Sequence, residues 1–184
     1  MMSFWRRLMI AWIGSLFLLP VYAQSKEAID TFGTGKNSNS ILGNINSFHK
    51  KYQTFFEEKL GFDLDLIGNP SLFNKVGEWI GTPYRYRGSS RRGINCSSFV
   101  SMLYSYLYNI ELKGSSRDIF KDNVVPIPKD SLQESDLIFF KIRKKNISHV
   151  GIYLGNNKFA HATRGKGVIV SDLGEEYYKK YFYS

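Results

Sequence analysis

The chain has 184 residues, of which 43% are hydrophobic and 16% aromatic, proportions that are typical of one globular domain and exclude a largely disordered chain. Lysine and arginine number 25 against 16 acidic residues, a net charge of +9. This excess indicates an anionic partner such as nucleic acid, acidic lipid or a charged cell wall, or else a merely soluble basic surface. The single cysteine excludes an intramolecular disulfide and a cysteine-rich zinc site.

Residues 1–23 have the features of an export signal. Arg6 and Arg7 precede an apolar stretch over 8–19, which is shorter than the roughly 18 residues of a spanning helix. A small-x-small pattern over 21–23 predicts cleavage after residue 23, with an uncleaved membrane anchor as the alternative. Because no cysteine directly follows the apolar stretch, we expect an exported protein, periplasmic or extracellular, that is not a lipoprotein.

A linker and an amphipathic helix are predicted over 24–69. Residues 24–46 are polar and rich in glycine, serine and asparagine, which is typical of a linker. Residues 47–60 carry aromatic and apolar side chains at helical spacing, and Gly61 is a suitable residue to end that helix.

Two further helices are predicted in the middle part of the chain, one on each side of a basic loop. Asn69 and Pro70 form an N-cap followed by proline at the first helical position, so we expect a short helix that ends at about Ile80. A basic, glycine-rich loop spans 84–95, and a second helix begins at Cys96.

Strand-like segments dominate the C-terminal part, after loops and turns over 109–135. The strands are predicted over Leu137–Lys141, His149–Leu154, Lys158–Thr163 and Gly167–Asp172. Helices followed by strands predict an α+β fold, with N-terminal helices packed on a C-terminal antiparallel sheet.

One cysteine at the start of a helix and two histidines on neighbouring strands form the strongest chemical pattern. A catalytic thiol must ionise, and the N-terminus of a helix capped by Asn95 favours negative charge on Cys96. An imidazole from His149 or His161 would act as base or ion-pair partner, and a third polar side chain would hold that imidazole. The alternatives are a buried, inert cysteine with histidines in core packing, or a His-His-Cys zinc site that lacks a regularly spaced fourth ligand.

The spacing of the histidines makes a geometric prediction. His149 and His161 are separated by an even number of positions, so a hairpin places them on one face only if its loop is odd or contains a bulge. A simple two-residue turn at Asn156 and Asn157 would send them to opposite faces.

Five segments, in order and at compatible spacing, resemble the NlpC-type cysteine peptidase family. They are GTPYRY with GINCSSFV (81–86 and 93–100), SSRD (115–118), DLIFF (136–140), SHVGIYLG (148–155) and FAHA (159–162). The resemblance covers about 70–184, which we take as the peptidase domain. It implies a papain-like fold and cleavage of peptidoglycan stem peptides, typically between D-glutamate and the diamino acid.

By position, the resemblance implies that Cys96 is the nucleophile, His149 the base and His161 the orienting residue. The reaction is acyl transfer to water, and no metal or cofactor is expected. The family's peptidoglycan substrate would be the partner of this chain. We expect no nucleic-acid binding, no stable membrane insertion after signal cleavage, and a monomer.

The resemblance also suggests which residues around the nucleophile contact the substrate. Tyr84, Ser97 and Ser116 are expected to stabilise the oxyanion or bind substrate, with ordinary core packing as the alternative for Tyr84. Two departures from the family pattern stand close to the nucleophile. Asn95 replaces an aspartate, which disfavours recognition of a free substrate amine, and Ser98 replaces a glycine, which narrows the cleft.

Four arginines in the loop before the nucleophile could steer anionic wall polymers toward the site, unless they form only a solvated loop. They are Arg85, Arg87, Arg91 and Arg92. Two other functions remain open: a related Cys-His amidase or acyltransferase, and a non-catalytic wall-binding module that has kept the fold.

Overall fold

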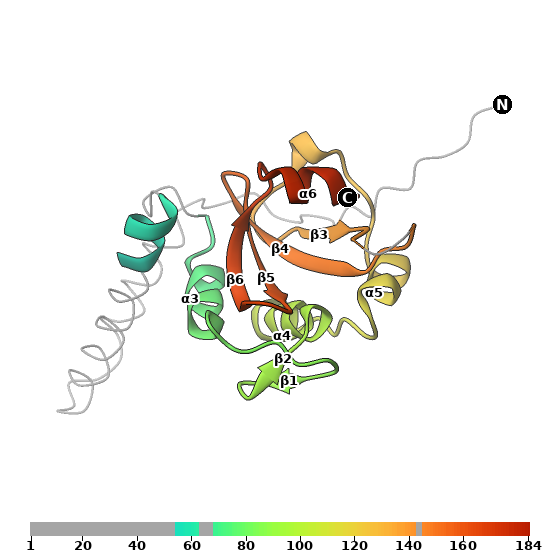
Figure 1. The fold of residues 1–184 in the computed structure, drawn as a ribbon, viewed down its shortest axis with the longest axis horizontal. Coiled ribbons are helices and arrows are strands. Elements are labelled where there is room, and N and C mark those ends of the chain that lie inside the picture. Colours follow the sequence, from blue (N-terminus) through green and yellow to red (C-terminus); the bar gives the residue numbers. More distant parts are fainter. Residues whose placement is uncertain (1–53, 63–67, 143–144) are drawn as a thin grey trace, which may run out of the picture. The chain divides into compact units, whose positions relative to one another are not determined.

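The computed structural model describes residues 54–62, 68–142 and 145–184 (Figure 1). The predicted signal, the linker and the first part of the helix over 47–60 lie outside these residues. Within the described residues, no helix combines the length and the apolar character needed to cross a bilayer.

The helical elements of the described chain are a π-helical turn η1 (Phe55–Lys59), α3 (Pro70–Trp79), α4 (Cys96–Tyr108), α5 (Ser116–Asn123), a 3-10 turn η3 (Lys129–Ser131) and α6 (Glu176–Tyr181). The strands are β1 (Ser89–Ser90), β2 (Gly93–Ile94), β3 (Leu137–Phe140), β4 (His149–Gly155), β5 (Lys158–Thr163) and β6 (Gly167–Asp172).

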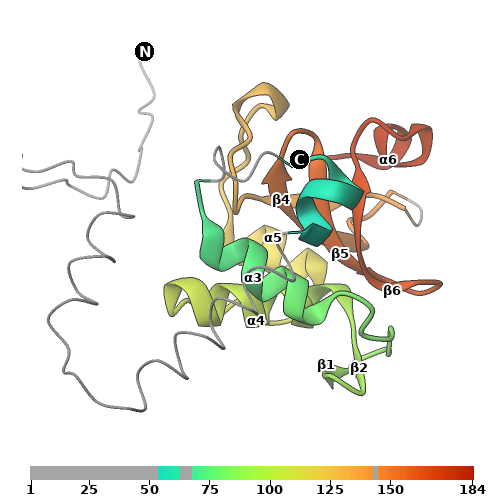
Figure 2. The ribbon, with the colours of Figure 1, turned by 90° about the vertical axis from the view of Figure 1, so that its left-hand side faces the viewer.

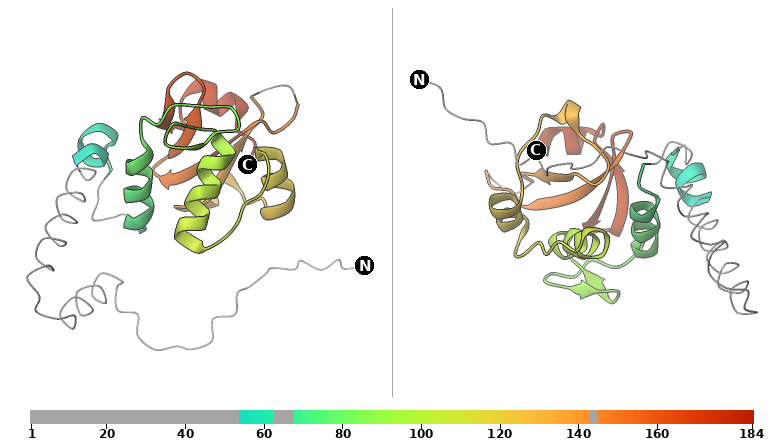
Figure 3. Two further views of the ribbon diagram at one scale, coloured as in Figure 1. Left: turned by 90° about the horizontal axis from the view of Figure 1, so that it is seen from below. Right: turned by 180° about the vertical axis from the view of Figure 1, so that it is seen from behind.

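The four long strands form one antiparallel sheet in the order β3-β4-β5-β6. Helix α4 lies against one face and α6 against the other (Figures 1 and 3). The α+β class is therefore confirmed. Each predicted strand is present, with bounds that differ from the prediction by at most one residue at one end.

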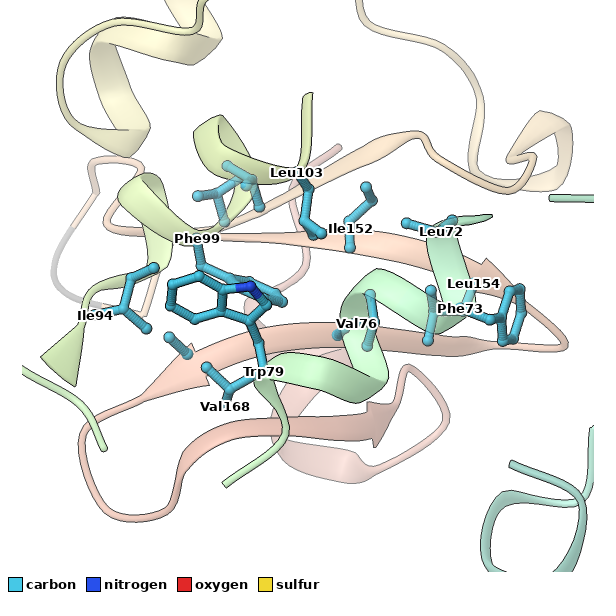
Figure 4. Packing of buried hydrophobic residues seen from close by; sticks show 14 of the residues in the cluster. Leu72, Phe73, Val76, Trp79, Ile94, Phe99, Leu103, Ile152, Leu154 and Val168 are labelled. Carbon is cyan, nitrogen blue, oxygen red and sulfur yellow. The ribbon is translucent and has the colours of Figure 1, made fainter. Parts of the chain in front are cut away.

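The larger hydrophobic core fills the space between helices α3, α4 and α5 and the sheet (Figure 4). Its fully buried side chains include Leu72, Val76, Phe99, Leu103 and Ile152. A smaller cluster lies on the opposite face, around Phe140, Phe159 and Tyr178. The sheet therefore has buried side chains on both faces.

Asparagine caps set the starts of α3 and α4, as predicted. Asn69 Oδ1 accepts a hydrogen bond from the backbone N–H of Leu72 at 3.1 Å, and Pro70 follows at the first helical position. Asn95 Oδ1 accepts from the N–H of Ser98 at 2.8 Å. The second cap fixes Cys96 as the first residue of α4.

Near the N-terminal limit of the described chain, a single π-helical turn replaces part of the helix predicted over 47–60. This turn, η1, ends before Gly61, whose φ of +66° suits the residue that terminates a helix. The Phe56 ring packs edge-on against Phe73 of α3, with ring centroids 5.1 Å apart. Figure 2 shows the turn (teal) next to α3 (green).

Two short helices were missing from the prediction. The segment 109–135, expected to contain only loops and turns, holds α5, whose first turn is closed by a capping box between Ser115 and Asp118. Helix α6 follows the last strand. The segment after it lies along β3, where the N–H of Tyr183 donates to the carbonyl of Phe139 at 2.9 Å.

The hairpin between β4 and β5 contains the predicted bulge. A two-residue turn at Asn156 and Asn157, both with positive φ, joins the strands, and the register shifts between Tyr153 and Gly155. A two-residue turn alone would place the two histidines on opposite faces of the sheet, and the register shift reverses this alternation. It leaves His149 and His161 on the same face of the sheet.

Gly151 follows His149 by two positions on β4 and lies close to His161 and Phe159 of β5. A Cβ atom added at Gly151 would stand 2.8 Å from the Phe159 ring and 3.3 Å from the Cβ of His161. We expect Gly151→Ala to lower the free energy of unfolding by about 1–3 kcal/mol, because the sheet must open to relieve this overlap. Urea unfolding measures the change. Gly165→Ala is the control, since a Cβ there meets no atom within 4 Å, and equal stability of both variants would contradict the prediction.

Candidate active site

A cleft of about 740 Å³ opens where the start of α4 meets the sheet. Its lining includes all six residues predicted for catalysis or substrate binding: Tyr84, Cys96, Ser97, Ser116, His149 and His161. They come from the loop before α4, the first turns of α4 and α5, and strands β4 and β5. The fold thus brings together residues separated by up to 77 positions.

Cys96 is the first residue of α4 and is partly exposed to the cleft. Burial raises the pKa of the thiol above its ordinary value, although backbone N–H groups of Val150, Ser97 and Cys96 and the charge of Arg164 act in the opposite direction. The sequence assigned the helix terminus only part of the stabilisation of the thiolate and an imidazole the rest, and in the free protein the helix terminus does not offset burial. Desolvation outweighs the helix, so the thiol is protonated at neutral pH.

The two histidines are in direct contact. His149 Nε2 lies 2.7 Å from His161 Nδ1, and the rings meet edge-on with centroids 4.9 Å apart. Burial lowers the pKa of His149 to about 4. Burial, and secondarily the neighbouring His149, lowers the pKa of His161 well below its usual range. Both imidazoles are therefore neutral at pH 7.

The contact with His161 determines which nitrogen of His149 can serve the cysteine. Because His149 Nε2 is engaged with His161, Nδ1 is the one nitrogen of His149 that could accept a proton from the Cys96 thiol in the same cleft. On its far side, His161 Nε2 lies 2.9 Å from Ser171 Oγ and 3.3 Å from the Tyr178 hydroxyl. Sequence reasoning missed these two residues. In the strand over 167–172 alternate side chains point to the same face of the sheet, and this pattern could have indicated that Ser171 lies on the face of His161. No sequence pattern indicated Tyr178.

The walls of the cleft are polar and well fixed. The backbone of Tyr84 forms a parallel bridge with Ile94, which holds the tyrosine beside the segment that leads into α4. Ser97 is buried and donates its hydroxyl to Asn95 Oδ1 at 3.1 Å. Ser116 is buried at the first position of α5.

Only one of the four predicted steering arginines, Arg87, lines the cleft. Arg91 instead pairs with Glu78 at 3.2 Å and stacks over the Trp79 ring, in a separate pocket. Arg164, which sequence reasoning missed, lies in the cleft with its guanidinium 5.9 Å from the centre of the Tyr84 ring.

The cleft is positively charged. Among the described residues that line it, two are arginines and none is aspartate or glutamate. An anionic ligand therefore meets attraction from Arg87 and Arg164 without a competing carboxylate.

Arg164 affects the thiol through its charge, since its guanidinium lowers the pKa of Cys96 and so partly offsets burial. We expect Arg164→Gln to shift the pH dependence of Cys96 alkylation to higher pH. Iodoacetamide labelling followed by intact-protein mass spectrometry measures this shift without ambiguity, because the chain has one cysteine. Lys166→Gln removes a neighbouring cation that does not line the cleft, and it should leave the profile unchanged. Equal profiles for all three proteins would contradict the assignment.

The buried imidazole of His149 also makes stability depend on pH. Its pKa is about 4 in the folded protein against 6.5 for an ordinary histidine, so between these values the unfolded chain binds a proton that folded His149 does not. Stability therefore falls as the pH falls through this window, by about 3 kcal/mol from His149 alone. Urea unfolding at pH 7, 5 and 4 should show this loss, and His149→Gln should reduce it. A wild-type curve that stays flat over this range would exclude a buried neutral imidazole.

A helix-initial cysteine beside a pair of histidines on an antiparallel sheet defines the papain-like α+β class. The chain belongs to the NlpC/P60 family, whose model matches residues 81–184.

Similar proteins agree with this assignment. The chain is 38% identical to a probable endopeptidase NlpC homolog from Haemophilus influenzae, over 76% of this chain and 75% of that protein. It is 35% identical to the murein DD-endopeptidase MepS/murein LD-carboxypeptidase of Escherichia coli, over 59% of this chain and 57% of that protein. The crystal structure of an NlpC/P60 family protein from Bacillus cereus matches with a TM-score of 0.54 and 30% identity, over 60% of this chain and 37% of that one.

Proposed function

We propose that this chain is an exported cysteine endopeptidase that hydrolyses the stem peptides of peptidoglycan. One observation carries the proposal: the hydrogen-bonded pair of His149 and His161 shares a cleft with the only cysteine of the chain. In this proposal Cys96 is the nucleophile, His149 the general base and His161 the orienting residue. The relatives named as endopeptidases, one of them acting on murein, support the same reaction class.

The neutral resting state leads to a defined sequence of proton transfers. His149 Nδ1 takes the thiol proton as Cys96 Sγ attacks the amide carbonyl, and the tetrahedral intermediate then expels the amine, which receives that proton from Nδ1. The resulting thioester is attacked by water, whose proton passes to Nδ1. The new carboxylic acid leaves, and the proton returns to Sγ.

The oxyanion of each tetrahedral intermediate needs donors that are already in place. The backbone N–H of Cys96 at the start of α4 and the hydroxyl of Tyr84 are the groups proposed for this role. The Ser97 and Ser116 hydroxyls are proposed to contact substrate from the cleft walls. None of these steps requires a metal or a cofactor.

The charge of the cleft supports a substrate that carries carboxylates. Stem peptides contain D-glutamate and a diamino acid, and Arg87 and Arg164 can pair with their carboxylates. We propose the bond between these two residues as the scissile bond. The bond that cross-links two stems is a second candidate, which the DD-endopeptidase named among the relatives favours.

The proposed substrate also indicates where the chain acts. Peptidoglycan lies outside the cytoplasmic membrane, which supports the proposed export signal over 1–23 and a periplasmic or extracellular site of action. We propose a linker and helix over 24–69 and a peptidase domain over 70–184 that acts as a monomer. The proposed reaction requires neither insertion into a membrane after signal cleavage nor a nucleic-acid partner.

Two purified muropeptides test the scissile bond directly. An uncross-linked stem contains only the D-glutamyl–diamino acid bond of interest, whereas a cross-linked dimer contains both bonds. Cleavage of the monomer, detected by liquid chromatography and mass spectrometry, supports the first candidate. Cleavage of the dimer into intact monomers supports the second. If neither compound is cut but both bind, the chain is a wall-binding module, and the proposal is wrong.

A further inference from the structure

The histidine pair continues into two buried hydroxyl groups that no family motif of the sequence contains. Ser171 Oγ of β6 lies 2.9 Å from His161 Nε2, and the hydroxyl of Tyr178 in α6 lies 3.3 Å from the same nitrogen. Ser171 Oγ also donates to the Tyr178 hydroxyl at 3.4 Å. All of these contacts are buried, so the groups form one chain of hydrogen bonds that ends at His149.

The direction of each hydrogen bond follows from the role of His149. To accept a proton at Nδ1, neutral His149 must carry its own proton on Nε2, which therefore donates to His161. His161 Nδ1 must then be the acceptor, at 2.7 Å. Because neutral imidazole has one N–H, the proton of His161 stands on Nε2, where only an acceptor can face it.

Hydroxyl groups meet this requirement, because an oxygen of Ser171 or Tyr178 can accept while its own proton points elsewhere. Among the described residues, the polar side chains in contact with His161 are His149, Ser171 and Tyr178, and none of them is a carboxylate. Hydroxyls thus occupy the place where a carboxylate would hold a positive imidazolium. The lowered pKa of both rings agrees with a neutral pair.

We propose that Ser171 and Tyr178 are positioning residues that hold the proton of His161 on Nε2 and thereby keep His149 Nδ1 free to accept the thiol proton. The inference rests on the proposed function, because the direction of these hydrogen bonds was derived from the role of His149 as the base. The position of the proton is a property of the free protein. The two residues act through His161 and do not touch the reacting atoms.

Packing of the C-terminal segment holds Tyr178 in place. Its ring packs edge-on against Phe159 and Phe140, with centroids 4.9 and 5.6 Å apart. The Phe182 ring at the end of α6 packs on Phe140, and Phe182 also forms a bridge with that residue of β3. The C-terminal helix therefore belongs to the machinery of the site, although the predicted helices all preceded the sheet.

The direct test is the tautomer of His161, read from imidazole ¹⁵N resonances of the free protein. We expect the wild type to show one neutral form with the proton on Nε2. The double variant Ser171→Ala with Tyr178→Phe should lose this form or mix it with the other tautomer. Ser171→Thr, which retains the hydroxyl, should keep the wild-type form. An unchanged tautomer in the double variant would overturn the proposal whatever the activity.

Activity supplies the second readout. We expect each single variant to lower kcat about tenfold with little change in KM, because one hydrogen bond that orients the base is lost. Ser101→Ala and Tyr104→Phe are matched controls, since they remove hydroxyls that bond to the carbonyls of Leu112 and Ser135 away from the cleft. Equal losses in variants and controls would show a merely structural role.

The two readouts separate this proposal from the proposed function. If the wild type does not cut peptidoglycan but the tautomer shifts in the double variant, the proposed function fails and the positioning role stands. If the wild type is active but the tautomer is insensitive to both hydroxyls, the positioning role alone is overturned. Thermal unfolding of each variant identifies any loss that comes from misfolding.

Discussion

Replacing Cys96 by alanine is expected to lower kcat on peptidoglycan fragments by at least about 10⁴-fold, because no other group of the chain can form the thioester. The variant should fold normally, since it removes only a partly exposed sulfur at the first position of α4. Substrate binding should persist, because the arginines and the cleft walls are unchanged. Product release measured by chromatography and binding measured by pulldown with purified peptidoglycan separate these effects.

The matched control for this change is Ser105→Ala, an exposed position in the same helix that does not line the cleft. It should keep full activity. Residual turnover of the alanine variant near the wild-type rate would mean that the cysteine is structural and that another group carries the chemistry.

Acid should inactivate the enzyme only near pH 4. In the proposed mechanism His149 must be neutral to accept the thiol proton. Burial lowers its pKa to about 4, so the proposed base would stay competent far below the usual range of histidine. Activity is lost as the pH falls through this value, because the imidazole then binds a proton. The pH profile of kcat/KM, recorded with a soluble muropeptide, should therefore be flat from pH 7 to about 5 and then decline.

Removal of the imidazole in His149→Ala should lower kcat about 10³-fold at every pH. A loss of this size is the usual contribution of a general base. His49→Ala changes the one histidine outside the described residues and should leave the profile unchanged. A wild-type acid limb between pH 6 and 7 would show that the base is a solvated imidazole and would contradict the buried pair.

Local sequence patterns were sufficient for the sheet and for the main helix starts. The strand that begins at His149 contains Val150, Ile152 and Tyr153, which are strand-forming residues. The asparagines before α3 and α4 are capping residues that act within one turn. An odd loop or a bulge followed from parity only under the hypothesis that His149 and His161 share one face of the hairpin, and the register shift agrees with it. Helices α5 and α6 were missed because they are short and depend on a capping box and on packing.

The electrostatics of the site could not be predicted in the same way. The sequence places Cys96 at a helix terminus, which lowers a thiol pKa, but only the folded protein shows how strongly burial opposes this effect. The charges of the cleft also depend on tertiary structure. Arg91 lies close to Cys96 in sequence but pairs with Glu78, whereas Arg164 comes from the turn after β5.

The two departures beside the nucleophile are compatible with the fold of the site. Asn95 Oδ1 accepts from the backbone of Ser98 and from the hydroxyl of Ser97, so an uncharged side chain caps α4 fully. Ser98 lines the cleft without being part of the Cys96, His149 and His161 set.

Digestion of purified peptidoglycan in H₂¹⁸O, with mass spectrometry of the released fragments, tests hydrolysis through Cys96 most directly. We expect each cut to yield a new amine and a new carboxylate that carries one ¹⁸O atom, because water resolves the thioester. A protein with Cys96→Ala should release no such fragments. Products without ¹⁸O that are joined to an added amine would instead show an acyltransferase. Binding without any release by the wild type would show a wall-binding module, and either result would contradict the peptidase.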